Sequence, residues 1–192
     1  MAEEAGPPTA PAPITAHAAA LQRHIVLLGL PGAGKSTIGP LVARRMGRRY
    51  VDLDDLIQSA AGKQVGRIFA EDGEAAFREM EHALGRRLLT DDRRPVVLSP
   101  GGGWVEDPAN RALLGQSVLS VYLRVDPDVA LARMGEAVET RPLLAGPHPL
   151  QKVRELLARR ETFYLQAQHT VNNGTMSPDE AASYIVALAL GR

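Results

Sequence analysis

The residues with the clearest chemical signature are eight consecutive ones, Gly29 to Ser36, which read Gly-Leu-Pro-Gly-Ala-Gly-Lys-Ser. Glycines at this spacing let the backbone fold tightly around an anion, so that consecutive N–H groups and the start of the next helix point at phosphate oxygens. In this phosphate-loop pattern Lys35 reaches the terminal phosphates and the Ser36 hydroxyl is a ligand for Mg²⁺. The pattern therefore predicts binding of a nucleoside triphosphate. A glycine-rich turn that only joins a strand to a helix is the alternative.

Two carboxylates stand close together further along the chain, at Asp52 and Asp54. Residues two apart in an extended segment share a face, so both side chains are expected to point the same way while Leu53 points into the core. Ligands of open α/β sheets gather outside the carboxyl ends of the strands, which places this pair where phosphates arrive. The alternative is an acidic helix start in which Asp54 or Asp55 is the N-cap.

Two further charged groups fall on or beside the apolar faces of predicted helices. Glu81 lies on the apolar stripe of a helix over 74–89, and Arg78, three residues earlier, is its expected partner. A purely structural ion pair is the alternative there. Arg160 falls on the inward stripe of a helix over 150–166, so its guanidinium must meet an anion, either a protein carboxylate or a ligand.

A segment without hydrophobic periodicity carries one more arginine. Residues 135–148 are rich in glycine and proline, and Arg141 lies in their middle. This composition indicates a mobile lid that excludes water and adds positive charge over a transferring phosphoryl group. An ordinary surface loop with an exposed arginine is the alternative.

Short apolar and amphipathic segments must position these residues. Five apolar segments are predicted to be strands, over 24–28, 49–52, 95–99, 117–124 and 169–171. Segments with helical periodicity or capping signals are predicted to be helices, over 38–46, 74–89, 127–134, 150–166 and 177–190, and residues 56–70 to form two short helices broken at Gly62 and Gly66. Three adjacent glycines, 101–103, follow the third strand and are expected where backbone approaches a ligand closely; a loose loop is the alternative.

Composition narrows the class of protein. The 192 residues carry 22 basic and 22 acidic side chains, so no net charge draws the chain to nucleic acid or a membrane surface. Cysteine is absent, which excludes disulfides and thiolate metal sites. No apolar run approaches membrane-spanning length, and the start of the chain lacks the pattern of a secretory signal. We therefore expect a disordered Ala/Pro-rich tail over 1–22, then a single domain over 23–192, in a cytoplasmic protein without nucleic-acid or membrane partners.

Taken together, six segments in this order resemble the shikimate kinases, which are small P-loop kinases of the nucleoside monophosphate kinase class. The match runs from about residue 23 to 190, and the segments are 29–37, 52–54, 68–81, 101–103, 141–146 and 159–164. The resemblance implies an α/β fold of three layers, in which a five-stranded parallel sheet is flanked by helices and carries a mobile lid. It also implies a monomer that uses ATP and Mg²⁺ to phosphorylate the 3-hydroxyl of shikimate.

The resemblance assigns roles to residues of this chain by analogy. Catalysis falls to Lys35, Asp54 and Arg141. ATP is held by Gly32, Ala33, Gly34, Lys35, Ser36, Thr37 and Arg133, and Mg²⁺ by Ser36 and Asp52. Shikimate is held by Asp54, Arg78, Gly101, Gly102, Gly103 and Arg160, with Phe69, Phe77, Glu81, Pro142 and Leu143 around its pocket.

The chain departs from the family pattern at two places near these sites. Trp104 follows the three glycines where a small residue is usual, so it either narrows the substrate pocket or packs outside it. Arg133-Met134 stands where two arginines are usual, which affects the expected adenine contacts. Two other functions stay open on sequence grounds: a catalytically silent ligand-sensing module with this fold, and a related kinase such as gluconate kinase. The latter is not expected to carry Asp54, Arg78 and Arg160 together.

Overall fold

The structure, a computed structural model, describes residues 22–191 apart from 93, 140 and 142. The predicted tail over 1–22 lies outside the described residues except for Gln22. The chain forms the predicted five-stranded parallel sheet, and its strand order is β2-β3-β1-β4-β5. Its strands are β1 (His24–Leu28), β2 (Arg49–Asp52), β3 (Val96–Ser99), β4 (Val118–Arg124) and β5 (His169–Asn172).

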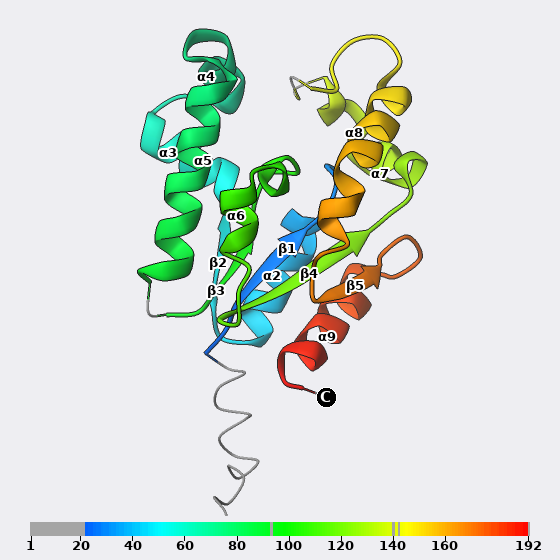
Figure 1. Ribbon diagram of the computed structural model, residues 1–192. Helices are drawn as coiled ribbons and strands as arrows, with labels where there is room; N and C mark the ends of the chain where they lie inside the picture. The colour runs from blue at the N-terminus through cyan, green and yellow to red at the C-terminus, as the bar shows by residue number, and fades with distance from the viewer. Residues whose placement is uncertain (1–21, 93, 140, 142, 192) are drawn as a thin grey trace, which may run out of the picture.

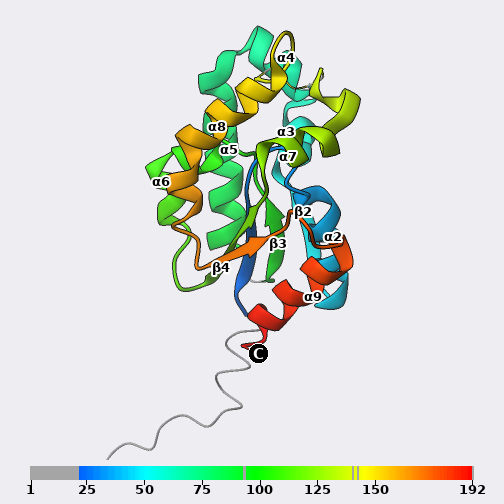
Figure 2. The ribbon, with the colours of Figure 1, turned by 90° about the vertical axis from the view of Figure 1, so that its right-hand side faces the viewer.

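Helices cover both faces of this sheet, which gives the expected three layers (Figure 1). They are α2 (Lys35–Arg45), α3 (Leu53–Ala61), α4 (Val65–Glu71), α5 (Gly73–Thr90), α6 (Pro108–Ala112), α7 (Pro127–Met134), α8 (Pro149–Tyr164) and α9 (Pro178–Ala189), with 3₁₀ turns η1 (Trp104–Glu106) and η2 (Gly135–Val138). In Figure 2, α2 and α9 lie on one face of the sheet and α5, α6 and α8 on the other. Every residue of β1 and β3 is buried, as expected for parallel strands covered on both sides.

The two short helices after β2 differ in detail from the prediction. α3 ends at Gly62, whose φ of 64° makes it a left-handed C-cap. The predicted second break at Gly66 is wrong, because Gly66 lies inside the first turn of α4. Glycine keeps its backbone N–H and adopts helical angles without strain; its cost in a helix is conformational entropy of about 1 kcal/mol relative to alanine, which does not interrupt the helix.

Three connections place polar residues at one edge of the sheet. The glycine-rich loop follows β1, Asp52 ends β2 and Asp54 lies just beyond it, and the three glycines follow β3. β2 and β3 end level with one another, because Asp52 is in register with Ser99. This is the edge at which ligands of open parallel sheets bind. Among the described residues, no helix has both the length and the apolar character needed to cross a membrane.

Candidate active site

The loop between β1 and α2 has the conformation that its glycines predict. Gly29, Gly32 and Gly34 adopt φ angles of 143°, 80° and 89°, which L-residues with side chains rarely adopt. A side-chain carbon at Gly32 would also lie 2.2 Å from the carbonyl oxygen of Ala130. The side chain of Lys35 folds back over the loop, where its Nζ donates to the carbonyl oxygens of Gly29 at 2.8 Å and Leu30 at 3.0 Å.

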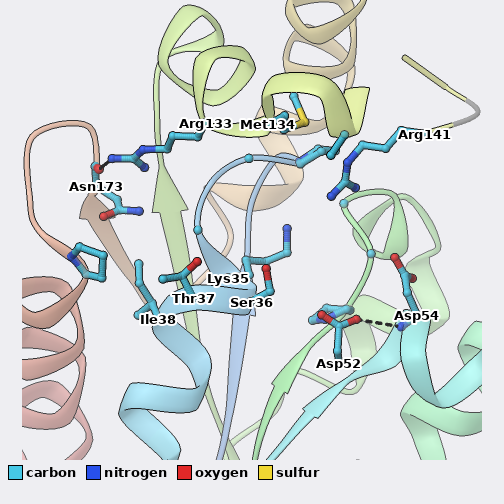
Figure 3. Close-up of a pocket in the computed structure, with 18 of the residues that line it drawn as sticks. Lys35, Ser36, Thr37, Ile38, Asp52, Asp54, Arg133, Met134, Arg141 and Asn173 are labelled. Carbon is cyan, nitrogen blue, oxygen red and sulfur yellow. Dashed lines mark hydrogen bonds between the residues drawn. The ribbon is translucent and has the colours of Figure 1, made fainter. Parts of the chain in front are cut away.

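This loop forms the floor of a cavity of about 470 Å³. Figure 3 shows Lys35 facing the same space as Asp54 and Arg141, while Arg133 lies on the far side of the loop. Other lining residues from the predicted set are Gly32, Gly34, Ser36, Thr37, Asp52, Gly101 and Gly102. Burial lowers the pKa of Lys35 to about 8, an effect that Asp54 opposes and Arg141 reinforces.

The two aspartates reach this cavity by a route that the sequence analysis did not predict. Asp52 ends β2 in an extended conformation, but Asp54 already belongs to the first turn of α3. The N-cap is Asp52, whose Oδ1 accepts from the backbone N–H of Asp54 at 3.1 Å. The expectation of one extended segment is therefore wrong, and so is the alternative with Asp54 or Asp55 as the cap. Both carboxylates nevertheless line the cavity.

Asp54 also lines a second cavity, of about 430 Å³, so it stands where the two cavities meet. Pro31, Gly101, Gly102 and Arg141 line both cavities as well. Burial raises the pKa of Asp54, with a smaller contribution from Asp52, and its Oδ1 is buried without a hydrogen-bond partner among the described residues. A buried oxygen of this kind is ready to accept a ligand donor such as a hydroxyl group.

The second cavity contains the predicted pair of Arg78 and Glu81. Nη1 of Arg78 donates to Oε2 of Glu81 at 2.7 Å, and its Nη2 to Oε1 of Glu74 at 3.0 Å. The Glu81 side chain is fully buried, and its Oε1 has no partner among the described residues. Burial raises the pKa of Glu81 to about 7, although Arg78 acts in the opposite direction.

This raised pKa predicts a pH-dependent stability. In the unfolded chain the Glu81 carboxyl loses its proton above its usual pKa of 4.5, whereas in the folded chain it keeps the proton up to about pH 7. The free energy of unfolding therefore falls as the pH rises from 4.5 to about 7. Glu81→Gln is neutral at every pH and should gain stability relative to the wild type as the pH rises. We expect the difference in melting temperature between variant and wild type to grow between about pH 5 and pH 8.

The control is Glu79→Gln on the exposed side of α5, which should reproduce the pH profile of the wild type. A constant difference between Glu81→Gln and the wild type across this range would contradict the assignment of a raised pKa to Glu81.

Arg160 is buried as the periodicity predicts, with its side chain only 1% exposed. The sequence left open whether its anion is a protein carboxylate or a ligand. Its Nε donates to Oε1 of Glu106 at 2.6 Å, a partner that the sequence analysis missed. Its Nη2 is buried without a hydrogen-bond partner among the described residues. Arg160 therefore has a protein partner on one side and an unsatisfied donor on the other.

The three glycines after β3 are required for space. Their φ angles are not positive, but added side-chain carbons would meet the groups around the second cavity. At Gly101 the carbon would lie 2.8 Å from Oε1 of Glu81, and at Gly103 it would lie 2.8 Å from Nη2 of Arg78 and 3.1 Å from Nη2 of Arg160. The carbonyl of Gly102 accepts from the hydroxyl of Tyr164 at 2.6 Å. This packing rules out a loose loop.

The structure shows where the two departures from the family pattern lie, Trp104 outside both cavities and Arg133-Met134 in the wall of the first. Trp104 is fully buried but lines neither cavity, and a side-chain carbon at Gly85 of α5 would lie 3.1 Å from its Nε1. It therefore packs outside the pocket. Arg133 and Met134 both line the first cavity, where Nη2 of Arg133 donates to the carbonyl of Asn173 at 2.8 Å. The roles of these two residues toward a nucleotide base stay predictions.

Asn173 is a second residue of the site that the sequence analysis missed. It follows β5, and its Nδ2 donates to the carbonyl of Ala33 inside the glycine-rich loop at 2.6 Å. A side-chain carbon at Gly34 would lie 3.2 Å from the same Nδ2. Asparagine in a short connection after a strand is too common in proteins to have identified it.

A parallel sheet of this order, with a glycine-rich loop after the central strand β1 and a lysine at the first position of α2, defines a P-loop kinase. A model of the family described as shikimate kinase matches residues 31–189. The shikimate kinase of Symbiobacterium thermophilum is 41% identical over 147 residues, 76% of this chain and 83% of that protein. The chain belongs to the shikimate kinase family.

Solved structures agree with this assignment. The shikimate kinase of Acinetobacter baumannii in complex with shikimate has a TM-score of 0.83 at 34% identity, covering 88% of this chain and 93% of that one. A gluconokinase from Sinorhizobium meliloti has a TM-score of 0.58 at 21% identity, covering 90% and 93%, and shares the fold alone. Neither the gluconate kinase nor the silent sensing module is favoured by these comparisons.

Proposed function

We propose that this chain transfers the terminal phosphoryl group of ATP to the 3-hydroxyl of shikimate and so produces shikimate 3-phosphate. Membership of the family supports this function. Within the molecule the proposal rests mainly on the convergence of two arginines. Nη2 of Arg78 and Nη2 of Arg160 both lie within 3.1 Å of the position that a side-chain carbon on Gly103 would occupy, which we call the point above Gly103. Two guanidinium groups that converge in a cavity favour a carboxylate there, because the planar guanidinium suits carboxylate geometry.

The first cavity suits the nucleotide. Backbone N–H groups from Gly32 to Thr37 would surround the β- and γ-phosphates, and Lys35 would turn from the loop carbonyls to the γ-phosphate. Ser36 and Asp52 would hold Mg²⁺, since this ion is usually bound by one or two protein oxygens together with phosphates and water. When bound, the ion neutralises charge on the phosphates. Ser36 and Asp52 line one cavity, which fits that donor set.

The second cavity suits the acceptor. With its carboxylate on Arg78 and Arg160, shikimate would present its hydroxyl groups to Asp54, which stands between the two cavities. Asp54 would accept the hydroxyl proton as the oxygen attacks the γ-phosphate, and its raised pKa makes it a stronger base than an exposed carboxylate. Arg141 lines both cavities and would stabilise the charge of the transferring group. We further propose that the enzyme is a cytoplasmic monomer without a nucleic-acid partner.

The test of this function compares shikimate with its methyl ester, using ATP and Mg²⁺ in a coupled assay. We expect turnover of the acid and weak or absent turnover of the ester, because the ester cannot form the charged contact with the two arginines. Arg160→Lys keeps a positive charge but loses the planar guanidinium group, which can donate two parallel hydrogen bonds to a carboxylate. It should raise the KM for shikimate roughly tenfold or more while kcat changes less.

The matched control is Arg154→Lys, which alters an exposed arginine of α8 that pairs with Asp128 at 3.3 Å and should leave both constants near those of the wild type. Equal turnover of acid and ester by the wild type would overturn the carboxylate contact and with it the choice of shikimate. Turnover of neither compound would overturn the proposed reaction.

Residues 135–148 are proposed to act as the lid, with Thr140 and Pro142 outside the described residues. Arg141 lines both cavities, Leu144 three residues further on is fully buried, and Leu143 is exposed. Closure would cover the transferring group and exclude water. We expect amide hydrogen exchange across this segment to slow when a non-hydrolysable ATP analogue and shikimate are added together. Equal exchange with and without both ligands would contradict the lid.

A further inference from the structure

We propose that Glu106 is a positioning residue for the substrate carboxylate: it fixes the guanidinium of Arg160 from behind, so that the terminal nitrogens of Arg160 face the substrate cavity. This inference rests on the proposed function, since it concerns how one of the two carboxylate-binding arginines is held. Glu106 ends the 3₁₀ turn η1, which follows directly on the three glycines after β3. The contact therefore joins the glycine segment to helix α8.

The geometry around Glu106 is that of a bridge between two consecutive arginines. Its Oε1 accepts from Nε of Arg160 at 2.6 Å, and its Oε2 lies 2.8 Å from Nε of Arg159. The Arg160 side chain is 1% exposed, whereas the Glu106 side chain is 30% exposed. Glu106 lines neither of the two cavities. It can therefore reach a substrate only through Arg160.

Engagement of Nε determines where the rest of the guanidinium points. The group is planar and rigid, so a hydrogen bond at Nε orients Nη1 and Nη2 as well. Nη2 of Arg160 lies 3.1 Å from the point above Gly103 and has no partner among the described residues. The nitrogen that the protein leaves unsatisfied therefore lies beside Gly103, and Arg160 and Gly103 both line the second cavity.

Without Glu106, Arg160 would lose this orientation. Its positive charge faces the Arg78 guanidinium across the point above Gly103, and like charges at that separation repel. Glu81 lines the same cavity and its buried Oε1 is also unsatisfied, so Glu81 offers Arg160 a competing acceptor. The two arginines instead contact different carboxylates, Glu81 for Arg78 and Glu106 for Arg160.

Three substitutions separate positioning from charge. Glu106→Gln keeps the length and an acceptor oxygen, Glu106→Asp keeps the charge but shortens the side chain, and Glu106→Ala removes both. We expect the KM for shikimate to rise roughly three- to tenfold in Glu106→Ala and Glu106→Asp, since binding must then order a freed arginine side chain. In Glu106→Gln it should stay within about threefold, while kcat and the KM for ATP change less than about twofold in all three.

Controls exclude a general loss of structure. Asp128→Ala removes an exposed ion pair, 3.3 Å long, between Asp128 of α7 and Arg154, which lies on α8 like Arg160. This substitution should leave the KM values for shikimate and ATP unchanged. Melting temperatures of all variants are measured alongside the kinetics. In a double-mutant cycle, Glu106→Ala should add little to the KM effect of Arg160→Lys, because both changes act on the same group.

The outcomes distinguish this inference from the function on which it rests. If the wild type does not phosphorylate shikimate, the proposed function fails. If it does so and Glu106→Ala keeps the KM of the wild type, only the positioning role is overturned. A normal KM in Glu106→Asp with a raised KM in Glu106→Gln would show that the charge acts and the geometry does not. Additive effects in the cycle would likewise overturn a route through Arg160.

Discussion

Lys35→Ala is expected to lower kcat by about 10²–10³ or more and to leave the fold intact. The ammonium group is the one basic side chain that the glycine-rich loop itself supplies, and phosphoryl transfer depends on positive charge placed at the transferring oxygens. In the structure Lys35 donates to the carbonyls of Gly29 and Leu30 and does not belong to the buried core, so its loss should leave the core packed. Steady-state kinetics with ATP, Mg²⁺ and shikimate measure the loss, and circular dichroism checks the fold.

The control for this substitution is Lys63→Ala. Lys63 forms ion pairs with Glu71 and Asp72 at 3.1 Å and 2.8 Å, away from both cavities. Its loss should change kcat by less than about twofold, because exposed ion pairs contribute little. If Lys35→Ala retained more than a tenth of the wild-type kcat, the assignment of Lys35 to the phosphates would be wrong.

Asp54→Asn and Asp52→Asn are expected to fail in different ways. Asp54→Asn removes the proposed base, so kcat with shikimate should fall about 10²-fold or more while nucleotide binding changes little. Asp52→Asn should instead raise the Mg²⁺ concentration needed for half-maximal rate, because a carboxylate supports the metal better than an amide. Asparagine is also a good N-cap, so the start of α3 should be preserved in the Asp52 variant.

Magnesium titrations of both variants, with shikimate saturating, measure this difference. Identical responses of Asp52→Asn and Asp54→Asn would show that the two carboxylates share one role. That result would remove the division between a metal ligand and a base, although both side chains line the same cavity.

Much of this architecture follows from short-range patterns in the sequence. The glycine-rich loop, the buried strands and the pair of Arg78 and Glu81 are encoded within a few residues of one another, so periodicity and spacing identify them. Capping residues in the sequence also predicted helix starts. The helix predicted from residue 177 has Ser177 as its N-cap, which forms a capping box with Glu180 at the start of α9. The same local rules misplaced Asp54, because the short sequence after β2 fits a strand end and a helix start equally well.

Residues that reach the site from distant segments could not be predicted in this way. Glu106 and Arg160 are 54 positions apart, and Asn173 and Ala33 are 140 apart. Only the order of the strands and the path of α8 across the sheet bring these groups together. Neither residue type is unusual at its position, so the sequence carries no sign of its partner. Burial of Arg160 was predictable, and the identity of its carboxylate was not.

The bond between Asn173 and the Ala33 carbonyl has a consequence for local unfolding of the protein. β5 is an edge strand of the sheet, and Asn173 follows it directly. An edge strand and the helix after it can separate from a sheet without loss of the central strands. Such an opening would detach the amide of Asn173 from the glycine-rich loop. A nucleotide that binds the closed loop would therefore also resist separation of β5 and α9, and bound ATP should slow proteolytic cleavage between them.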